Sequence, residues 1–304
     1  MLSIEPGNAS LGATVAGVDL SKPLSDRDFG RILEAIGKFG LLRFPAQTLT
    51  PEQQKVFCLR FGSVKPITGR LAPYTEPGFP EINIVSNIKV DGKFIGAADA
   101  GVIWHTDMIH NTPPGFANVL YALKIPRRDG KTLGGTEFID GIAAYDDLPA
   151  EVKAKIENAR GVYTGETYNG VARTPANDYS VNSYKGNTKV AVTQPAVLTH
   201  PISGRKTLYL DPGHVDGIQG LPAGEAEAMT VFLIEHLMKP KYRFVYTWTE
   251  GDLVIWDNLR SFHRAVFDYG PDEPRLIRRC QVQGEKVFDP AFVKTALEKA
   301  RAAA

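Results

Sequence analysis

The sequence predicts a mainly β protein, a jelly roll or a β-sandwich, with flanking helices. About eight short segments are rich in β-branched and aromatic residues, and Gly, Pro, Asn and Asp separate them. The helical segments are few and mostly flank this strand-rich region, whereas a parallel βαβ fold would alternate strand and helix. A two-sheet antiparallel architecture therefore fits the pattern best.

The helices are predicted from local start signals. Ser25 precedes an apolar pattern of helical spacing, with Asp28 three residues on, a capping arrangement. Thr50 is followed by Pro51 at the first turn and by Gln53 at the capping-box position. The four predicted helices span residues 25–40, 50–62, 150–159 and 223–238.

The strands are predicted from composition and from the turn residues between them. A short strand begins at Leu41, in the stretch LLRFPAQ. The remaining predicted strands are EINIVSNI, FANVLYALKI, GTEFID, KTLYL, FVYTWT, DLVIWD, SFHRAVFDY and RLIRRCQV.

The length of the chain, 304 residues, allows one large β-rich domain. No repeat, linker or low-complexity tract divides it, so we expect a single domain over residues 1–304. Residues 65–101 contain several Pro and Gly, and residues 163–188 are polar and rich in Gly and Asn. Long loops of this kind are often lids or binding loops. An ordinary surface loop explains each of the two segments equally well.

Charge and composition exclude several classes of protein. The chain has 35 basic and 34 acidic residues, which argues against a general nucleic-acid binder. Its two cysteines, Cys58 and Cys280, form no CxxC motif and favour a reducing compartment. The N-terminal stretch does not resemble a signal peptide, and no run of 18 apolar residues exists. We therefore expect a cytoplasmic protein that is not bound to membranes and that can form a homo-oligomer.

The stretch IWHTDMIHNTPP is a candidate metal-binding motif. On a strand, His105 and Asp107 share one face, whereas His110 lies on the other. On a helix, His110 is about 140° away from His105 around the axis. In either case a third ligand should come from elsewhere in the chain. The candidates are His200, His214, His236 and His263.

Among these candidates, His263 has the most suggestive neighbourhood. It lies in strand-like sequence, and PRLIRRC follows shortly after it. On a strand, Arg275 and Arg279 point to one face. That face is either exposed to solvent or turned inward, and an inward guanidinium needs an anion, because an unpaired buried charge costs several kcal/mol. Arginine suits a carboxylate or sulfonate partner. His236 is better explained as a partly buried residue near the end of its helix.

Two histidines and one carboxylate on one face of a metal ion are the ligand set of non-haem Fe(II) oxygenases. The open positions admit a bidentate co-substrate together with dioxygen. If that co-substrate is 2-oxoglutarate, its far carboxylate needs a cation, such as an arginine near the distal histidine, and a hydroxyl donor. A Zn-dependent lyase or hydrolase and a non-catalytic jelly-roll binding protein are the alternative interpretations.

The ordered motifs WHTD, GGTEFIDGIAAYDDLP, GDLVIWDN with its following histidine, and PRLIRRC resemble the taurine dioxygenase / 2,4-dichlorophenoxyacetate dioxygenase family. The resemblance covers nearly the whole chain. It implies a double-stranded β-helix (a cupin-like jelly roll) and a dioxygenase that uses Fe(II), 2-oxoglutarate and O2. Because halogenases of this superfamily replace the carboxylate ligand with a small residue, Asp107 favours hydroxylation.

The resemblance also implies roles for particular residues. His105, Asp107 and His263 would be the iron ligands. Thr136 and Arg275 would hold the distal carboxylate of 2-oxoglutarate, and the remaining arginine of that strand face, Arg279, would meet an anionic group of the substrate.

The substrate class is inferred from where this sequence departs from the family pattern. Taurine-cleaving members place a sulfonate-binding histidine after the stretch equivalent to RFGSVKPITGR, whereas this chain has Pro66, Ile67 and Thr68 there. IVSNIKVDGK and GGTEFID resemble the phenoxyacetate-cleaving branch more closely. The expected substrate is a small anionic carboxylate such as an aryloxyalkanoate, with an alkyl sulfate or sulfonate as the alternative.

Overall fold

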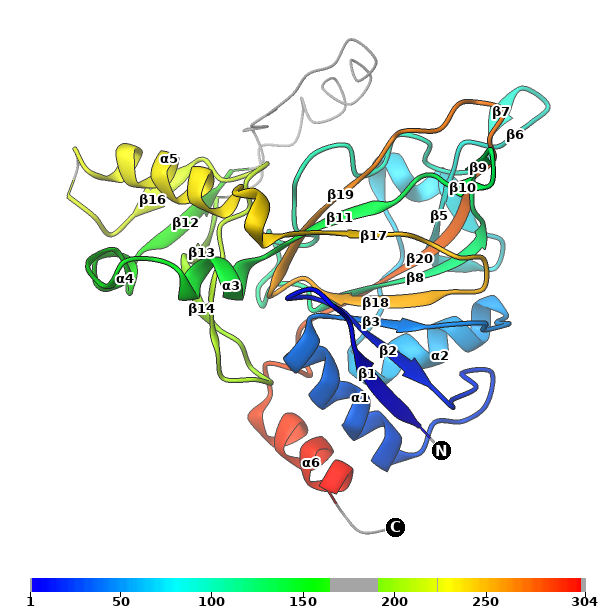
Figure 1. The fold of residues 1–304 in the computed structure, drawn as a ribbon, viewed down its shortest axis with the longest axis horizontal. Helices are drawn as coiled ribbons and strands as arrows, with labels where there is room; N and C mark the ends of the chain where they lie inside the picture. Colours follow the sequence, from blue (N-terminus) through cyan, green and yellow to red (C-terminus); the bar gives the residue numbers. More distant parts are fainter. Residues whose placement is uncertain (1, 165–190, 223, 302–304) are drawn as a thin grey trace.

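An eight-stranded mixed sheet forms the centre of the fold in the computed structural model, which describes residues 2–164, 191–222 and 224–301 (Figure 1). All its pairings are antiparallel except that of β2 with β3. In spatial order its strands are β1 (Ser3–Pro6), β2 (Ala13–Ala16), β3 (Leu41–Phe44), β18 (Leu253–Asp257), β8 (Ala117–Lys124), β20 (Leu276–Val282), β5 (Phe79–Ser86) and β4 (Thr75–Glu76).

A smaller sheet of three antiparallel strands lies over one face of the large sheet. Its order is β17 (Arg243–Tyr246), β11 (Thr136–Asp140) and β19 (Ser261–Ala265). Phe138 of β11 packs in one buried cluster with Leu120, Trp256 and Ile277 of the large sheet. This apolar layer holds the two sheets together. The prediction of sheets packed on each other with flanking helices is therefore confirmed in part, because the large sheet is mixed and the described residues form four further small sheets.

Three helices cover the opposite face of the large sheet: α1 (Asp26–Phe39), α2 (Pro51–Phe61) and α6 (Pro290–Arg301). Phe29 of α1 and Phe57 of α2 both pack edge-on against Phe61, with ring centroids 5.1 Å and 5.2 Å apart. A Cβ on Gly30 would lie 2.2 Å from the Ala296 carbonyl oxygen, so this glycine lets α6 approach α1 closely. These aromatic contacts belong to a second buried cluster, which lies between the large sheet and the helices.

The predicted caps of the first two helices are confirmed. The Ser25 side chain accepts a hydrogen bond from the Asp28 backbone N–H at the start of α1. Thr50 and Gln53 form a reciprocal capping box at the start of α2. Both helices begin within one residue of the predicted position because these signals are local in the sequence.

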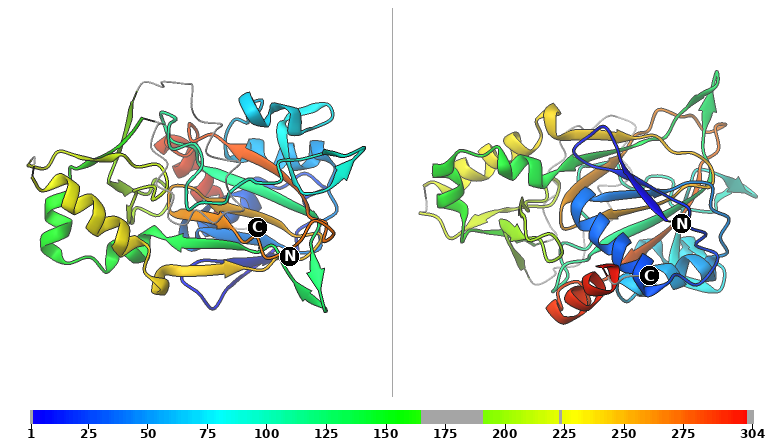
Figure 2. Two further views of the ribbon diagram at one scale, coloured as in Figure 1. Left: turned by 90° about the horizontal axis from the view of Figure 1, so that it is seen from above. Right: turned by 60° about the horizontal axis from the view of Figure 1, so that its bottom comes forward.

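A group of short elements extends away from the two sheets, as both views in Figure 2 show. It includes the predicted helices at residues 150–159 and 223–238, whereas its strands at 160–163, 192–199 and 217–219 were not predicted. The elements are α3 (Gly141–Asp146), α4 (Ala150–Ile156), α5 (Ala226–Leu237), the 3-10 helix η4 (Pro240–Tyr242), the sheet of β13 (Val192–Pro195), β12 (Arg160–Tyr163) and β16 (Gly217–Gln219), and the pair of β14 (Val197–Thr199) and β15 (Lys206–Leu208).

The two predicted insertions differ in what the structure describes. Residues 65–101 hold the 3-10 helix η1 (Gly69–Tyr74), β4 and β5 of the large sheet and the hairpin of β6 (Lys89–Val90) and β7 (Lys93–Phe94). Most of the second insertion, residues 165–188, lies outside the described residues. A further hairpin joins β9 (Arg127–Arg128) to β10 (Lys131–Thr132). Within the described ranges, no helix is long and apolar enough to cross a membrane.

Candidate metal centre and substrate site

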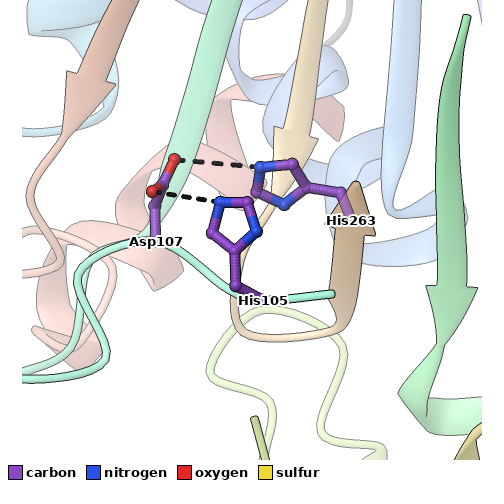
Figure 3. A group of neighbouring side chains, drawn as sticks. All are labelled: His105, Asp107 and His263. Carbon is purple, nitrogen blue, oxygen red and sulfur yellow. Dashed lines mark ion pairs between the residues drawn. The ribbon is translucent and has the colours of Figure 1, made fainter. Parts of the chain in front are cut away.

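His105, Asp107 and His263 form a cluster at the edge of the small sheet, as Figure 3 shows. His263 lies on β19, and the backbone of His105 pairs with it as an isolated β-bridge. Asp107 Oδ1 is 3.6 Å from His105 Nε2, and Asp107 Oδ2 is 3.9 Å from His263 Nε2. One ligand atom from each residue lies within 4.8 Å of the other two. This spacing lets all three side chains bind one ion.

The protonation states of this cluster suit a divalent cation. His105 Nδ1 lies 2.8 Å from the Ile103 carbonyl oxygen, which can only accept, so the His105 Nε2 lone pair faces Asp107. Burial and the nearby His105 lower the pKa of His263 well below its usual value. Burial raises the pKa of Asp107, but Arg279 and the two histidines outweigh it and hold this pKa below its ordinary value. Imidazole nitrogens and a carboxylate are ligands that Fe(II) accepts.

His110 lies outside this cluster, but the predicted reason was wrong. The segment after His105 is not a regular strand, because turns and bends follow it and Met108 has a φ of +60°. The parity of a strand therefore does not apply. The His110 ring instead lies edge-on to Tyr163 and His214, with centroids 6.1 Å away in each case. His214 in turn lies 6.2 Å from the His105 ring, so His110 lies beside the metal cluster but outside it.

The three other candidates for the third ligand have structural partners, and His214 lies 2.9 Å through Nδ1 from Asp211 Oδ2. His200 is fully buried, and its Nε2 lies 2.6 Å from Asp257 Oδ2. His236 near the end of α5 lies 2.9 Å through Nε2 from the Ala144 carbonyl oxygen, as expected for a buried residue in this position. None of the three belongs to the metal cluster.

Arg275, one of the two residues expected to hold 2-oxoglutarate, is a buried cation. It is 4% exposed, which excludes a solvent-facing position, and its Nε has no hydrogen-bond partner among the described residues. Ser86 and Asn87 at the end of β5 hydrogen-bond its backbone at 2.7 Å and 2.8 Å. Burial lowers the pKa of Arg275, and contact with Tyr269 partly offsets this effect. An anion is the natural partner of such a group.

The first residue of β11, Thr136, is buried, and its hydroxyl accepts a 3.0 Å hydrogen bond from Trp248 Nε1. Two residues earlier, Gly134 has a φ of +69°, and a Cβ there would lie 3.2 Å from Arg275 Cδ. The Arg275 side chain therefore passes directly over the segment that leads into Thr136. Arg275, predicted from PRLIRRC, therefore packs against Gly134, two residues before Thr136, which was predicted from GGTEF.

Arg279 points into the metal cluster from β20. Its Nη1 lies 3.4 Å from Asp107 Oδ2, and its Nη2 lies 3.4 Å from Asn83 Oδ1. The next residue, Cys280, packs in the buried cluster on the helix side of the large sheet. Successive side chains therefore point to opposite faces in this part of β20, as expected for a strand. A bulge between Leu276 and Ile277 interrupts this alternation between Arg275 and Arg279.

Sequence reasoning missed several polar residues around the cluster. Asn83 on β5 is fully buried and donates to the Tyr74 carbonyl oxygen while it accepts from Arg279. Asp211 is also fully buried and contacts the loop between the two ligands as well as His214. The only signal for Asp211 is its place in YLDPGH, directly after the predicted strand KTLYL.

The chain is similar to known proteins along most of its length. Residues 3–281 match the family model of the taurine catabolism dioxygenase TauD, TfdA family. The chain is 30% identical over 283 residues to an alpha-ketoglutarate-dependent 2,4-dichlorophenoxyacetate dioxygenase of Burkholderia sp. (strain RASC), covering 90% of this chain and 91% of the relative. It is 29% identical over 281 residues to an alkylsulfatase of Acinetobacter baylyi (strain ATCC 33305 / BD413 / ADP1), covering 90% and 83%.

A solved structure is similar over almost the same length. AAD-2 in complex with Mn(II) and N-oxalylglycine superimposes with a TM-score of 0.71 at 29% identity, over 93% of this chain and 98% of that chain. The resemblance seen in the sequence is confirmed by the family model and by these relatives. The chain therefore belongs to the TauD/TfdA family, as a dioxygenase that depends on iron(II), 2-oxoglutarate and oxygen.

Proposed function

We propose that the protein hydroxylates a C–H bond of a small anionic substrate, with His105, Asp107 and His263 as the iron ligands. Thr136 and Arg275 hold the distal carboxylate of 2-oxoglutarate, and Arg279 binds the anionic group of the substrate. The balanced reaction converts 2-oxoglutarate, O2 and the substrate C–H bond into succinate, CO2 and an alcohol.

One observation supports this proposal above the others: Arg279 contacts the two-histidine, one-carboxylate cluster, Arg275 is buried four residues earlier in the chain, and neither arginine is exposed. Arg275 has no ion-pair partner among the described residues. Arg279 is held by Asp107, whose charge is needed for the metal. A Zn-dependent hydrolase or a non-catalytic binding protein gives no reason to bury both cations, whereas a dicarboxylate co-substrate and an anionic substrate supply two anions.

Bound iron(II) supplies the redox chemistry that activates dioxygen with the electrons of 2-oxoglutarate. The residues of this chain supply orientation. The His105 ring is fixed by its Nδ1 bond to the Ile103 carbonyl, so Nε2 is the atom that would bind the ion. Arg275 and Thr136 fix the far end of the co-substrate, and Arg279 fixes the substrate. The surrounding buried side chains, such as Trp256 and Phe138 against His263, keep water away from one side of the centre.

The arrangement of the sheets supports a double-stranded β-helix. The three-stranded sheet packs against β8, β18 and β20 of the large sheet, and Phe138 and Trp256 lie in the layer between them. The metal cluster lies where β19 meets the loop after Gly101. We assign the whole chain, residues 1–304, to one such domain.

The substrate assignment favours a carboxylate over a sulfate ester or a sulfonate. Pro66 and Thr68 are exposed, and their segment carries no histidine that could bind a sulfonate. Arg279 is the cation that reaches the cluster, from β20. A guanidinium binds a planar carboxylate through two parallel N–H donors. The phenoxyacetate dioxygenase relative supports the carboxylate, whereas the alkylsulfatase relative keeps an alkyl sulfate as the second candidate.

A substrate panel tests this function. Purified protein with Fe(II), 2-oxoglutarate and O2 is given aryloxyalkanoates, alkyl sulfates, sulfonates or acylated amino acids, and succinate release is measured. We expect at least one aryloxyalkanoate to stimulate succinate release and to yield a hydroxylated or cleaved product in equal amount. Stimulation by alkyl sulfates alone would replace the carboxylate with the second candidate. Succinate release that no member of the panel increases would contradict the proposed substrate classes.

A further inference from the structure

Asp211 lies beside the metal cluster, and none of the motifs that identify the site include it. It is fully buried, between β15 and β16. A carboxylate in such a position is retained only when hydrogen bonds replace its lost solvation. What these hydrogen bonds connect therefore indicates what the residue does.

The hydrogen bonds of Asp211 join the loop that carries His105 and Asp107 to the segment that holds Gly213 and His214. Its Oδ2 accepts from the backbone N–H of Thr106 at 3.1 Å and lies 2.9 Å from Nδ1 of His214. Its Oδ1 accepts from the backbone N–H of Gly213 at 2.9 Å. Thr106 is the residue between the candidate ligands His105 and Asp107. The carboxylate thus binds the peptide unit that connects them.

The loop that carries His105 and Asp107 needs such a restraint. The backbone of His105 pairs with β19 as an isolated bridge, and three residues later the chain turns at Met108 with a φ of +60°. Between these points, Thr106 is held from two sides. Its N–H donates to Asp211, and its hydroxyl donates to the Asn258 carbonyl oxygen at 2.8 Å. The direction of the Asp107 carboxylate relative to the His105 ring follows from how Thr106 is fixed.

We propose that Asp211 is a positioning residue of the metal centre, which sets the relative direction of His105 and Asp107 by fixing the Thr106 peptide. It acts through the loop backbone and does not touch the ion. The inference rests on the proposed ligand set. An Asp211→Asn variant keeps the volume, but an amide has one accepting oxygen. Its NH2 group must then face either Gly213 N–H or the Thr106 and His214 donors, so a backbone donor loses its partner.

The test measures Mn(II) binding to the metal-free protein from the electron paramagnetic resonance signal of free Mn(II), at a temperature where every variant is folded. Groups that orient metal ligands typically change metal affinity by about tenfold or more when they are removed. We therefore expect Asp211→Asn to raise the Kd for Mn(II) by roughly tenfold. An unchanged Kd would overturn the inference.

Two further variants separate positioning from stability. Asp252 is also fully buried and accepts hydrogen bonds from Arg43, Tyr246 and Thr249. Asp252→Asn therefore reports the loss of a comparable buried network, and we expect its Mn(II) affinity to equal that of the wild type. His214→Ala leaves the hydrogen bond between Asp211 and the Thr106 N–H in place. This variant should therefore also bind Mn(II) with wild-type affinity. If either variant weakens Mn(II) binding as much as Asp211→Asn does, the action through Thr106 is refuted.

A measurement on the wild type applies even if Asp211→Asn does not fold. The Thr106 amide should exchange slowly with deuterium in the metal-free protein, as measured by nuclear magnetic resonance. Exchange at the rate of an unprotected amide would overturn the inference. The two proposals fail differently: a wild type that binds no Mn(II) contradicts the proposed ligand set, whereas normal binding by both the wild type and Asp211→Asn contradicts only the role of Asp211.

Discussion

The backbones of His105 and His263 hydrogen-bond to each other in both directions. His105 N–H donates to the His263 carbonyl oxygen at 3.0 Å, and His263 N–H donates to the His105 carbonyl oxygen at 2.8 Å. Their rings lie 4.3 Å apart between centroids. This isolated bridge joins two segments far apart in the chain and places the two imidazoles at one point.

Replacing Arg275 by Ala should weaken 2-oxoglutarate binding while Fe(II) binding stays nearly intact. A hydrogen bond to a charged group contributes about 1.5–3 kcal/mol, so we expect the Kd for 2-oxoglutarate to rise between about tenfold and a hundredfold. Anaerobic titration with 2-oxoglutarate measures this change. Arg264→Ala, which removes a cation paired with Glu137 on the small sheet, is the control. An Arg275→Ala variant with wild-type affinity would remove Arg275 from the co-substrate site.

Replacing Arg279 by Ala should separate substrate binding from co-substrate turnover. The variant loses the group proposed to bind the anionic end of the substrate, so the KM for the substrate should rise strongly. Decarboxylation of 2-oxoglutarate without substrate should largely continue, because Arg275 and Thr136 are unchanged. Succinate release with and without substrate measures both effects. If the reaction without substrate also disappears, Arg279 serves the co-substrate or the metal site through its contact with Asp107.

Replacing Gly134 by Ala should disturb the co-substrate site through backbone and packing. The φ of +69° disfavours any residue with a Cβ, and this Cβ would press on Pro126, Tyr269 and Arg275 at 3.1–3.2 Å. We expect a loss of stability of about 1 kcal/mol or more and a higher KM for 2-oxoglutarate. Gly130, at a φ of +78° with nothing within 4 Å, is the matched control. Gly130→Ala should lose stability without a change in this KM, and an equal KM effect there would contradict the packing argument.

The stability of the protein should fall in mildly acidic solution partly through His236. Burial lowers the pKa of this imidazole below 6.5, and Lys239 Nζ lies 3.2 Å from its Nδ1. The unfolded chain therefore binds a proton more readily than the folded one, so stability falls as pH drops below about 6.5 and through the lower folded pKa. A His236→Gln variant should show a shallower fall in Tm between about pH 6.5 and 5. Identical slopes for both proteins would exclude His236 as a contributor.

The sequence predicted those elements whose signals are local. Ser25 and Thr50 mark the starts of α1 and α2, because a capping residue and its helix are adjacent in the sequence. His263 could be inferred because PRLIRRC follows it at close range. Short strands such as β12 and β16 were missed, since what forms them is their pairing across about 55 residues of chain. Their own composition carries too weak a preference.

The surroundings of the metal cluster could not be predicted for the same reason. Asp211 meets Thr106 across 105 positions, and no spacing rule connects the two. The reasoning about His110 assumed regular structure after His105, whereas the left-handed turn at Met108 is a tertiary feature. Binding residues that are fixed by distant contacts become visible only when the fold brings them together.

The central claim is that His105, Asp107 and His263 bind the catalytic iron. Crystals grown with Mn(II) and N-oxalylglycine, the pair found in the similar AAD-2 structure, test it directly through the anomalous difference map. We predict one strong peak in contact with both imidazoles and the Asp107 carboxylate, with the N-oxalylglycine chelating the ion and its far carboxylate on Arg275. A peak bound by other residues, or a cluster that binds no ion while N-oxalylglycine is in place, would contradict the claim.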